Sequence, residues 1–144
     1  MVIDTSALVA IALHEPSRES LLDAIRAAVT RTVSSVSLLE AGIVLRARSG
    51  QPGVQALYDF LENQSIETVV FDEAQAKLAV AAFARFGKGM GHRAQLNFGD
   101  CAVYALAAMR GEPLLATGSD FAATDLTVIG PTSGSCGGTR ADGV

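Results

Sequence analysis

Four acidic residues, Asp4, Glu40, Asp100 and Asp120, each lie near a point where an apolar, strand-like segment gives way to a helix or a turn. Carboxylates that gather in one cleft raise each other's pKa and destabilise the fold unless a cation binds among them. Ligands that are all oxygen favour Mg²⁺ or Mn²⁺ over zinc. Such ions polarise a phosphoryl oxygen and activate water. The four acids therefore predict a metal-assisted phosphate chemistry in which they are both metal ligands and catalytic groups.

The elements that must position these acids alternate along the chain. The sequence predicts strands at 1–4, 32–36, 66–70, 113–117 and 127–129, and helices at 5–13, 17–29, 37–48, 52–63, 73–86 and 97–110. This alternation predicts a three-layer α/β/α sandwich around a central, mostly parallel sheet of four to five strands. Ligands of such sheets bind outside the carboxyl ends of the strands, so the four acids are expected to meet in one cleft there.

Each acid also has an explanation that involves no chemistry. Asp4 can cap the helix that follows it, because its side chain can accept a free backbone N–H. Glu40 lies three residues after Ser37, which is the spacing of a Ser-x-x-Glu capping box. Asp100, three residues after Asn97, would interact favourably with the helix dipole. The occurrence of all four acids at strand ends favours a shared site over four separate caps and turns.

Four segments, VIDTSAL, SLLEAGIVL, LNFGDCAVYALA and LLATGSDF, occur in an order and spacing that closely resemble the PIN-domain ribonucleases, and within them the VapC toxins. The resemblance covers residues 1–130, the expected PIN-like nuclease domain. It implies that the same four acids bind the metal, with Ser119 where the family usually has Asn or Asp. Residues 131–144, rich in Gly, Ser and Thr, are expected to form a disordered tail.

A second group of polar residues lies near the acids. The hydroxyls of Thr5, Ser6 and Thr117 can hold a metal-bound water or a phosphate oxygen. The resemblance places Asn97 near the cleft, and Asp125 matches a further acid found there in many members. Helix capping or turn formation is the alternative for each of these residues.

The formal net charge is −4, which is unusual for a protein that binds nucleic acid through basic surface. Without the four proposed ligands, 11 of the 15 acids remain, against 11 Lys and Arg. The candidate RNA contacts are Arg46, Arg85, Lys88, His92 and Arg93. The last three lie in the segment FGKGMGHRAQL, which lacks the ending of a phosphate-binding P-loop and is predicted to be a mobile loop.

The apolar residues of the helices between 17 and 63 exceed what one sheet face needs, and this surplus predicts a partner. The residues concerned are Leu21, Leu22, Ile25, Leu57, Phe60 and Leu61. Core packing is the alternative for each of these side chains. The resemblance implies two partners, a second copy of the chain and a VapB-type antitoxin whose C-terminal segment blocks the acid cleft. An inhibitory cation would take the electrostatic place of the metal.

The cysteines and the apolar segments bear on the location of the protein. Cys101 is expected to be a buried thiol and Cys136 lies in the tail, so no disulfide framework or zinc site is indicated. The apolar residues 7–13 are too few to cross a membrane and follow no basic segment. A cytoplasmic protein is expected.

The predicted function is that of a Mg²⁺- or Mn²⁺-dependent endoribonuclease, the toxin of a toxin–antitoxin pair, which hydrolyses RNA of the tRNA or rRNA class needed for translation. One alternative is a small-molecule phosphohydrolase with Asp4 as nucleophile, but the second Asp usual in that class is Ser6 here. The other is a catalytically silent PIN-like module that binds RNA or protein.

Overall fold

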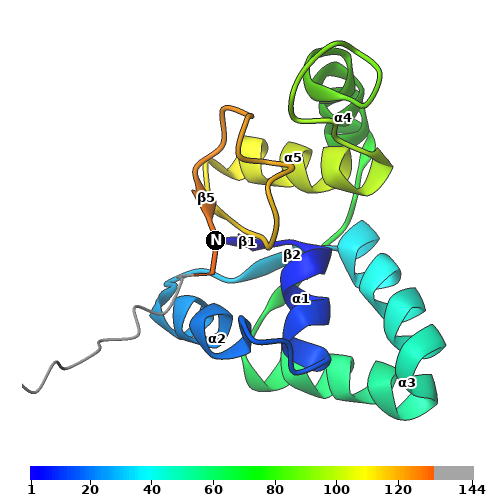
Figure 1. The fold of residues 1–144 in the computed structure, drawn as a ribbon, viewed down its shortest axis with the longest axis vertical. Helices are drawn as coiled ribbons and strands as arrows, with labels where there is room; N and C mark the ends of the chain where they lie inside the picture. The colour runs from blue at the N-terminus through cyan, green and yellow to red at the C-terminus, as the bar shows by residue number, and fades with distance from the viewer. Residues whose placement is uncertain (132–144) are drawn as a thin grey trace, which may run out of the picture.

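The computed structural model describes residues 1–131, in which strands and helices alternate along the chain (Figure 1). The elements in chain order are β1 (Val2–Ile3), α1 (Thr5–Ala12), α2 (Arg18–Ala27), β2 (Thr32–Ser34), α3 (Ser35–Asn63), β3 (Glu67–Val69), α4 (Glu73–Phe86), α5 (Phe98–Arg110), β4 (Leu114–Leu115) and β5 (Val128–Ile129). The predicted strands are longer than the observed ones. Strands β1 and β2 end early because α1 and α3 begin within two residues of them.

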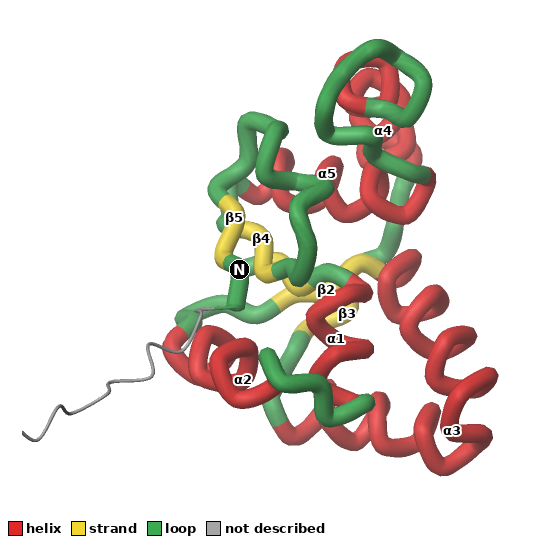
Figure 2. The backbone as a smooth tube through the Cα atoms, in the orientation of Figure 1, coloured by secondary structure: helices red, strands yellow, loops and turns green. Residues whose placement is uncertain are grey.

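The strands form one parallel sheet in the order β3-β2-β1-β4-β5. The first helices, α1 to α3, lie on one side of this sheet, and α4 and α5 lie on the other (Figures 1 and 2). Each side has its own apolar core. The predicted three-layer α/β/α sandwich is confirmed, and its parallel strands all end at the same edge.

Helix α3 bends sharply near its middle, as Figure 1 shows. Gly50 has a φ of 66°, a left-handed conformation that breaks the helix, and Pro52 lies two residues later. Proline lacks a backbone N–H and starts helices well, so the second half of α3 begins again at this point. The two helices predicted at 37–48 and 52–63 correspond to the two halves of α3.

Most of the apolar residues predicted as a surplus belong to the core. Leu21, Leu22, Ile25, Leu57 and Leu61 are all buried against α1 and the sheet, and Phe60 is partly buried beside them. The predicted surplus of apolar surface on these side chains was wrong and the alternative, core packing, is observed, because α3 bends at Gly50 and its second half packs these side chains into the core. Other apolar side chains are exposed instead, among them Leu39, Ile43, Val80 and Phe98.

The loop between α4 and α5, residues 87–97, is held at both of its ends. Lys88 donates its backbone N–H to Leu96 at 3.0 Å, and Leu96 donates to Phe86 at 2.9 Å. Ala94 and Leu96 are buried, whereas Lys88 and Arg93 are exposed. The segment predicted to be a mobile loop is thus a closed loop with an anchored base and an exposed tip.

Three other expectations concern the remaining parts of the chain. Cys101 is a buried free thiol, as predicted. Cys136 and the predicted tail, except for residue 131, lie outside the described residues. Within residues 1–131, no helix has the length and apolar character needed to cross a membrane.

Candidate active site

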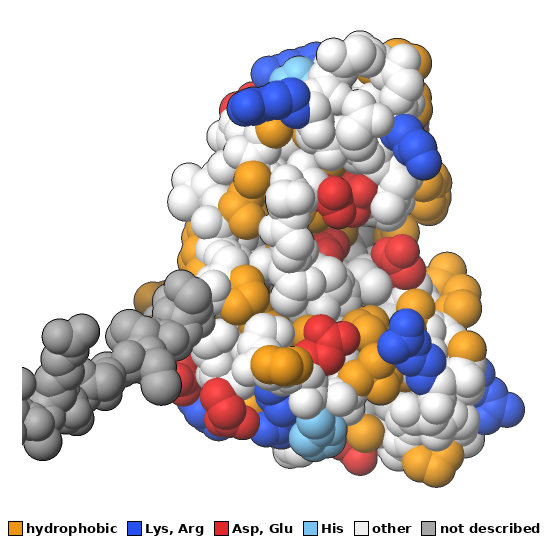
Figure 3. All heavy atoms as spheres, in the orientation of Figure 1, with side chains coloured by type: hydrophobic (Ala, Val, Ile, Leu, Met, Phe, Trp, Pro, Cys, Tyr) orange, Lys and Arg blue, Asp and Glu red, His pale blue; other side chains and the backbone are white. Residues whose placement is uncertain are grey.

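The four predicted acids converge on the edge of the sheet where the parallel strands end. Asp4 directly follows β1, Glu40 lies in the second turn of α3, Asp100 lies in the first turn of α5, and Asp120 lies in the segment after β4. Acidic side chains gather in a hollow in the middle of the face seen in Figure 3. Four segments that are far apart in sequence therefore contribute carboxylates to one region.

Asp4 is the most buried of the four, with 6% of its surface exposed. Its Oδ2 accepts hydrogen bonds from the backbone N–H of Ser6 at 2.9 Å and from the Ser6 hydroxyl at 2.5 Å. Burial raises the pKa of Asp4, the bonds from Ser6 lower it, and the charge of Glu40 raises it. Both bonds from Ser6 converge on one carboxylate oxygen of Asp4, and they fix the position of this side chain at the end of β1.

Asp100 combines a structural and a chemical role. It forms a capping box with Asn97, in which Asp100 Oδ2 accepts the Asn97 N–H at 2.8 Å and Asn97 Oδ1 accepts the Asp100 N–H at 2.9 Å. Burial raises the pKa of Asp100 to about 6; the bond from Asn97 opposes this, and the charges of Asp4, Asp120 and Glu40 add to it. The charges of the other three acids therefore all act on the Asp100 carboxyl.

Glu40 does not cap its helix. Helix α3 begins at Ser35, its N-cap is Ser34, and the buried Ser37 hydroxyl has no hydrogen-bond partner. The capping box considered for Ser37 and Glu40 is wrong, because the helix starts two residues earlier than the sequence suggested. Glu40 instead accepts a hydrogen bond from the Thr5 hydroxyl at 2.8 Å, which directs its carboxylate toward the end of β1.

Gly99, which sequence reasoning missed, sets the space available to Glu40. A Cβ atom added to Gly99 would lie 2.8 Å from Oε2 of Glu40 and 3.4 Å from Oδ1 of Asn97. The first turn of α5 thus lies so close to the Glu40 carboxylate that a larger residue at position 99 would force this side chain to move. A glycine within the first turn of a helix is unfavourable by itself, and this was the signal that could have identified it.

Ser6 links the first acid to the segment that carries the last one. Its hydroxyl, while donating to Asp4, accepts the backbone N–H of Thr117 at 3.0 Å. Gly118 then turns the chain with a φ of 83°. Asp120 is exposed, and the next residue, Phe121, is buried in the core and anchors the segment. Of the predicted supporting residues, Ser6, Thr117, Thr5 and Asn97 all contact this region.

The donors in the site suit a hard divalent cation. The carboxylates and nearby hydroxyls offer oxygen only, and the raised pKa values of Asp4 and Asp100 report repulsion and desolvation that a bound cation would relieve. Within residues 1–131, no three acidic, His or Cys side chains form a ready-made metal cage. Mg²⁺ needs no such cage, since it usually takes one or two carboxylates and keeps several waters.

Asp125 lies away from the acid cluster. It accepts hydrogen bonds from the Tyr104 hydroxyl at 2.6 Å and from Arg85 at 3.0 Å. The bond to Tyr104, and then Arg85, lower the pKa of Asp125, while burial and Asp125 raise the pKa of Tyr104 to about 12. Asp125 and Arg85, predicted for the metal site and for RNA, thus brace the segment after Asp120 against α4 and α5. Tyr104 was not predicted, because its position within an apolar helix resembles that of any core residue.

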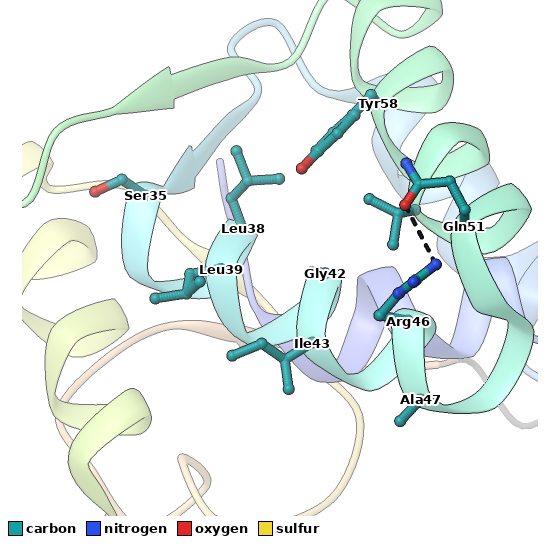
Figure 4. A pocket seen from close by; sticks show the side chains of 10 residues that line it. Ser35, Leu38, Leu39, Gly42, Ile43, Arg46, Ala47, Gln51 and Tyr58 are labelled. Carbon is teal, nitrogen blue, oxygen red and sulfur yellow. Dashed lines mark hydrogen bonds between the residues drawn. The ribbon is translucent and has the colours of Figure 1, made fainter.

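The remaining candidate RNA contacts occupy two places. Arg46 lines a hollow of about 720 Å³ between the two halves of α3, where it bonds Gln51 at 3.4 Å (Figure 4). Tyr58 and Leu38 point toward one another across this hollow. Lys88, His92 and Arg93 all lie in the loop between α4 and α5.

Comparison with known proteins places this geometry in a family. The PIN domain family matches residues 1–126. A ribonuclease VapC of Mycolicibacterium smegmatis is 47% identical over 129 residues, which cover 90% of this chain and 99% of the relative. Ribonuclease VapC30 of Mycobacterium tuberculosis is 44% identical over 129 residues, covering 90% of this chain and 98% of the relative.

Solved structures share the fold at lower identity. VapC20 of Mycobacterium tuberculosis, described as a sarcin–ricin loop cleaving toxin, aligns with a TM-score of 0.73 and 16% identity over 88% of this chain and 95% of its own. A toxin–antitoxin complex from Klebsiella pneumoniae aligns with a TM-score of 0.69 and 17% identity over 90% and 96%. The sequence matches, supported by the fold, show that this chain belongs to the PIN domain family and, within it, to the VapC ribonucleases.

Proposed function

We propose that this protein is a Mg²⁺- or Mn²⁺-dependent endoribonuclease and the toxin of a toxin–antitoxin pair. The observation that carries the proposal is the convergence on Asp100 of the charges of Asp4, Glu40 and Asp120, three acids from distant segments. Burial first, and then the charges of these three acids, raise the pKa of Asp100 to about 6, and such an arrangement is costly for a fold that makes no use of it. The activity named for its relatives is that of a ribonuclease.

In the proposed reaction, Asp4 and Asp100 would hold the cation through their carboxylates. Glu40, held by Thr5, and the exposed Asp120 would complete the site for the cation and position the attacking water. When bound, the cation supplies positive charge that polarises the phosphoryl oxygen and lowers the pKa of water. Ser6 and Asn97 hold the two inner acids in place, as positioning residues.

The proposed substrate is RNA of the tRNA or rRNA class, and the proposed location is the cytoplasm, where such RNA is found. Ten of the 11 Lys and Arg residues lie within 1–131, and five of these ten form ion pairs with acidic side chains. Few Lys and Arg side chains are therefore left to bind RNA without regard to its shape. This favours recognition of one structured RNA over general degradation.

The proposed partners are a VapB-type antitoxin and a second copy of the chain. An apolar groove of about 360 Å³ runs beside Glu40, between α3 and the start of α5, and is lined by Val36, Leu39, Ile43 and Phe98 among others. Leu39 and Phe98 are 64% and 77% exposed. An amphipathic antitoxin segment with a basic residue would fit both the groove and the acids at its end.

Expression in bacteria tests the toxin proposal. Wild-type protein is expected to arrest growth, the Asp4→Asn and Asp100→Asn variants are expected to be harmless at equal abundance, and a cognate antitoxin should restore growth. Arrest that persists in both variants would overturn the enzymatic explanation. It would favour the silent module, which acts by binding RNA or protein and does not need intact acids.

A further inference from the structure

We propose that the exposed tip of the loop between α4 and α5 is an arm that holds the RNA backbone away from the cleaved bond, with Lys88 and Arg93 as its phosphate contacts. This inference rests on the proposed function and specifies how the substrate is held. The loop, residues 87–97, carries Lys88, His92 and Arg93 and contains no acidic residue. It therefore has a local positive charge in a chain whose net charge is −4.

The two cations are available for a ligand. Both side chains are exposed, and within residues 1–131 neither one forms an ion pair. Arg85, at the end of α4, differs from them because it is bound to Asp125 at 3.0 Å. His92 is also engaged, since its Nδ1 accepts the backbone N–H of Ala94 at 3.1 Å and its ring packs edge-on against Phe86 at 4.9 Å.

The base of the loop fixes where its tip points. The backbone bonds between Lys88 and Leu96, and between Leu96 and Phe86, close the loop, and the buried Ala94 and Leu96 anchor its C-terminal part. An ordered loop loses less conformational freedom on binding than a free one, so exposed cations on it bind phosphate more effectively. Gly89 and Gly91 adopt positive φ values of 85° and 79°, which keep the tip tight between the two cations.

The arm lies on the same face as the acids. Figure 3 shows Lys and Arg side chains beside a histidine at the upper end of the molecule, over α4 and its loop, and acidic side chains in the hollow below them. The loop leads directly into Asn97 and Asp100. An RNA strand whose scissile phosphate lies among the acids can thus continue toward the arm, where its phosphates meet positive charge.

The test compares wild-type protein with a Lys88→Ala/Arg93→Ala variant on two substrates, an extended RNA and a short oligonucleotide with few nucleotides beside the cleaved bond. The arm predicts a roughly tenfold rise in KM for the extended RNA with kcat retained. The slope of the logarithm of the RNA binding constant against the logarithm of the salt concentration should become shallower by about 0.7 for each cationic side chain removed, which is the value for single strands. The short oligonucleotide should be cleaved equally well by both proteins.

A matched control removes two cations elsewhere. Arg26→Ala/Lys77→Ala changes the net charge equally but alters only exposed pairs with Asp23 and Glu73, and it should behave like wild type. The proposal is overturned if the arm variant and this control show the same KM and salt dependence, or if the arm variant loses only affinity for an acidic protein partner.

Binding of fluorescent RNA without metal separates the arm from the nuclease. If wild-type protein binds RNA without cleaving it, and the arm variant binds it more weakly, the proposal of the arm is supported and the nuclease proposal fails. If wild-type protein cleaves RNA and both double variants bind it equally, the arm fails and the nuclease stands.

Discussion

Gly99 of α5 lies so close to Glu40 of α3 that a Cβ atom at position 99 would stand 2.8 Å from the Glu40 carboxylate. Contacts between nonbonded carbon atoms are normally about 3.5–4.0 Å, and even a carbon–oxygen contact is strained at such a distance. The glycine therefore permits Glu40 to lie against the start of the helix that carries Asp100. The distance between two of the four acids depends on the absence of a side chain.

The Gly99→Ala substitution is expected to reduce cleavage at least tenfold with little loss of thermal stability. The atom that the new methyl group meets is the end of a flexible side chain, so Glu40 moves aside and leaves the cleft. Alanine also favours the helix by about 1 kcal/mol over glycine, which offsets the remaining strain. Cleavage rates and thermal unfolding measured on one preparation test this expectation.

Gly42→Ala in α3 is the matched control, because nothing lies within 4 Å of a Cβ added there. This variant should keep full activity and gain stability. Equal loss of activity in both variants would show that the contact with Glu40 is unimportant.

Removal of the Ser6 hydroxyl is expected to loosen two acids at once. In Ser6→Ala, Asp4 loses its 2.5 Å bond and the Thr117 N–H loses its acceptor. The unsatisfied N–H should cost about 1–3 kcal/mol of stability. Mn²⁺ affinity, measured by calorimetry, should also fall, because Asp4 and the segment that carries Asp120 are no longer fixed.

Ser6→Thr keeps the hydroxyl and should restore most of the Mn²⁺ affinity. Ser20→Ala removes a hydroxyl of α2 that donates to the carbonyl of Ser17, the residue before this helix, at 2.8 Å, and should leave Mn²⁺ binding unchanged. Unaltered metal affinity in Ser6→Ala would show that the hydroxyl serves only the fold.

The metal-free protein should lose stability as the pH rises from 4.5 to above 6. The pKa of Asp100 is raised from 3.8 to about 6, so the folded state binds this proton more tightly than the unfolded state does. The free energy of unfolding then decreases with pH across this interval. Asp4 shifts in the same direction. The lowered pKa of Glu112 acts in the opposite direction, but its stabilisation is complete above its ordinary value of 4.5.

Asp100→Asn should raise the melting temperature of the metal-free protein at neutral pH by a few degrees and flatten its pH dependence. Asp72→Asn is the control, since Asp72 also accepts a helix N-terminal N–H, from Gln75 at 2.9 Å, but does not act on the pKa of Asp4 or Asp100. A steep pH dependence that survives in Asp100→Asn would exclude this carboxyl as its source. With saturating Mg²⁺, the stability of wild-type protein should rise with pH and no longer fall, because cations bind the ionised carboxylates.

A negative charge introduced at the centre of the groove beside Glu40 should displace an antitoxin segment that binds there. Leu39→Glu is expected to weaken binding of an antitoxin peptide at least tenfold while leaving RNA cleavage in place, because the side chain is 64% exposed and supports no core contact. Val29→Glu, at a fully exposed apolar residue away from the groove, provides the control. Equal peptide affinity for both variants would place the antitoxin elsewhere.

The sequence predicted the fold well because its periodicity and its helix signals agree. Helix α4 runs from Glu73 to Phe86 as predicted, and Asn97 caps α5. The start of α3 was misplaced by two residues, since Ser34 and Ser37 are both good caps and only the tertiary structure selects Ser34. The apolar surplus was misjudged because periodicity does not reveal how far a bent helix encloses the core.

The candidate site was predictable in its acids but not in their connections. Asp4 follows a predicted strand and Asp100 follows a predicted helix start at Asn97, although in the structure a loop and not a strand precedes that helix. The Ser6–Thr117 bond joins residues 111 positions apart and has no local signature. The Asp125 carboxylate was assigned to the cleft because it matches a further acid that many members of the resembling family have there. Its bond to Tyr104 depends on the packing of α5 against the following segment.

Cleavage of cellular RNA by purified, antitoxin-free protein tests the central claim most directly. Wild type and Asp72→Asn should produce the same discrete fragments with Mg²⁺ or Mn²⁺ and none with EDTA, while Asp100→Asn should be slower by at least about a hundredfold. Undiminished cleavage by Asp100→Asn, cleavage that persists in EDTA, or intact RNA with folded, metal-loaded wild type would contradict a metal-dependent ribonuclease built on these acids.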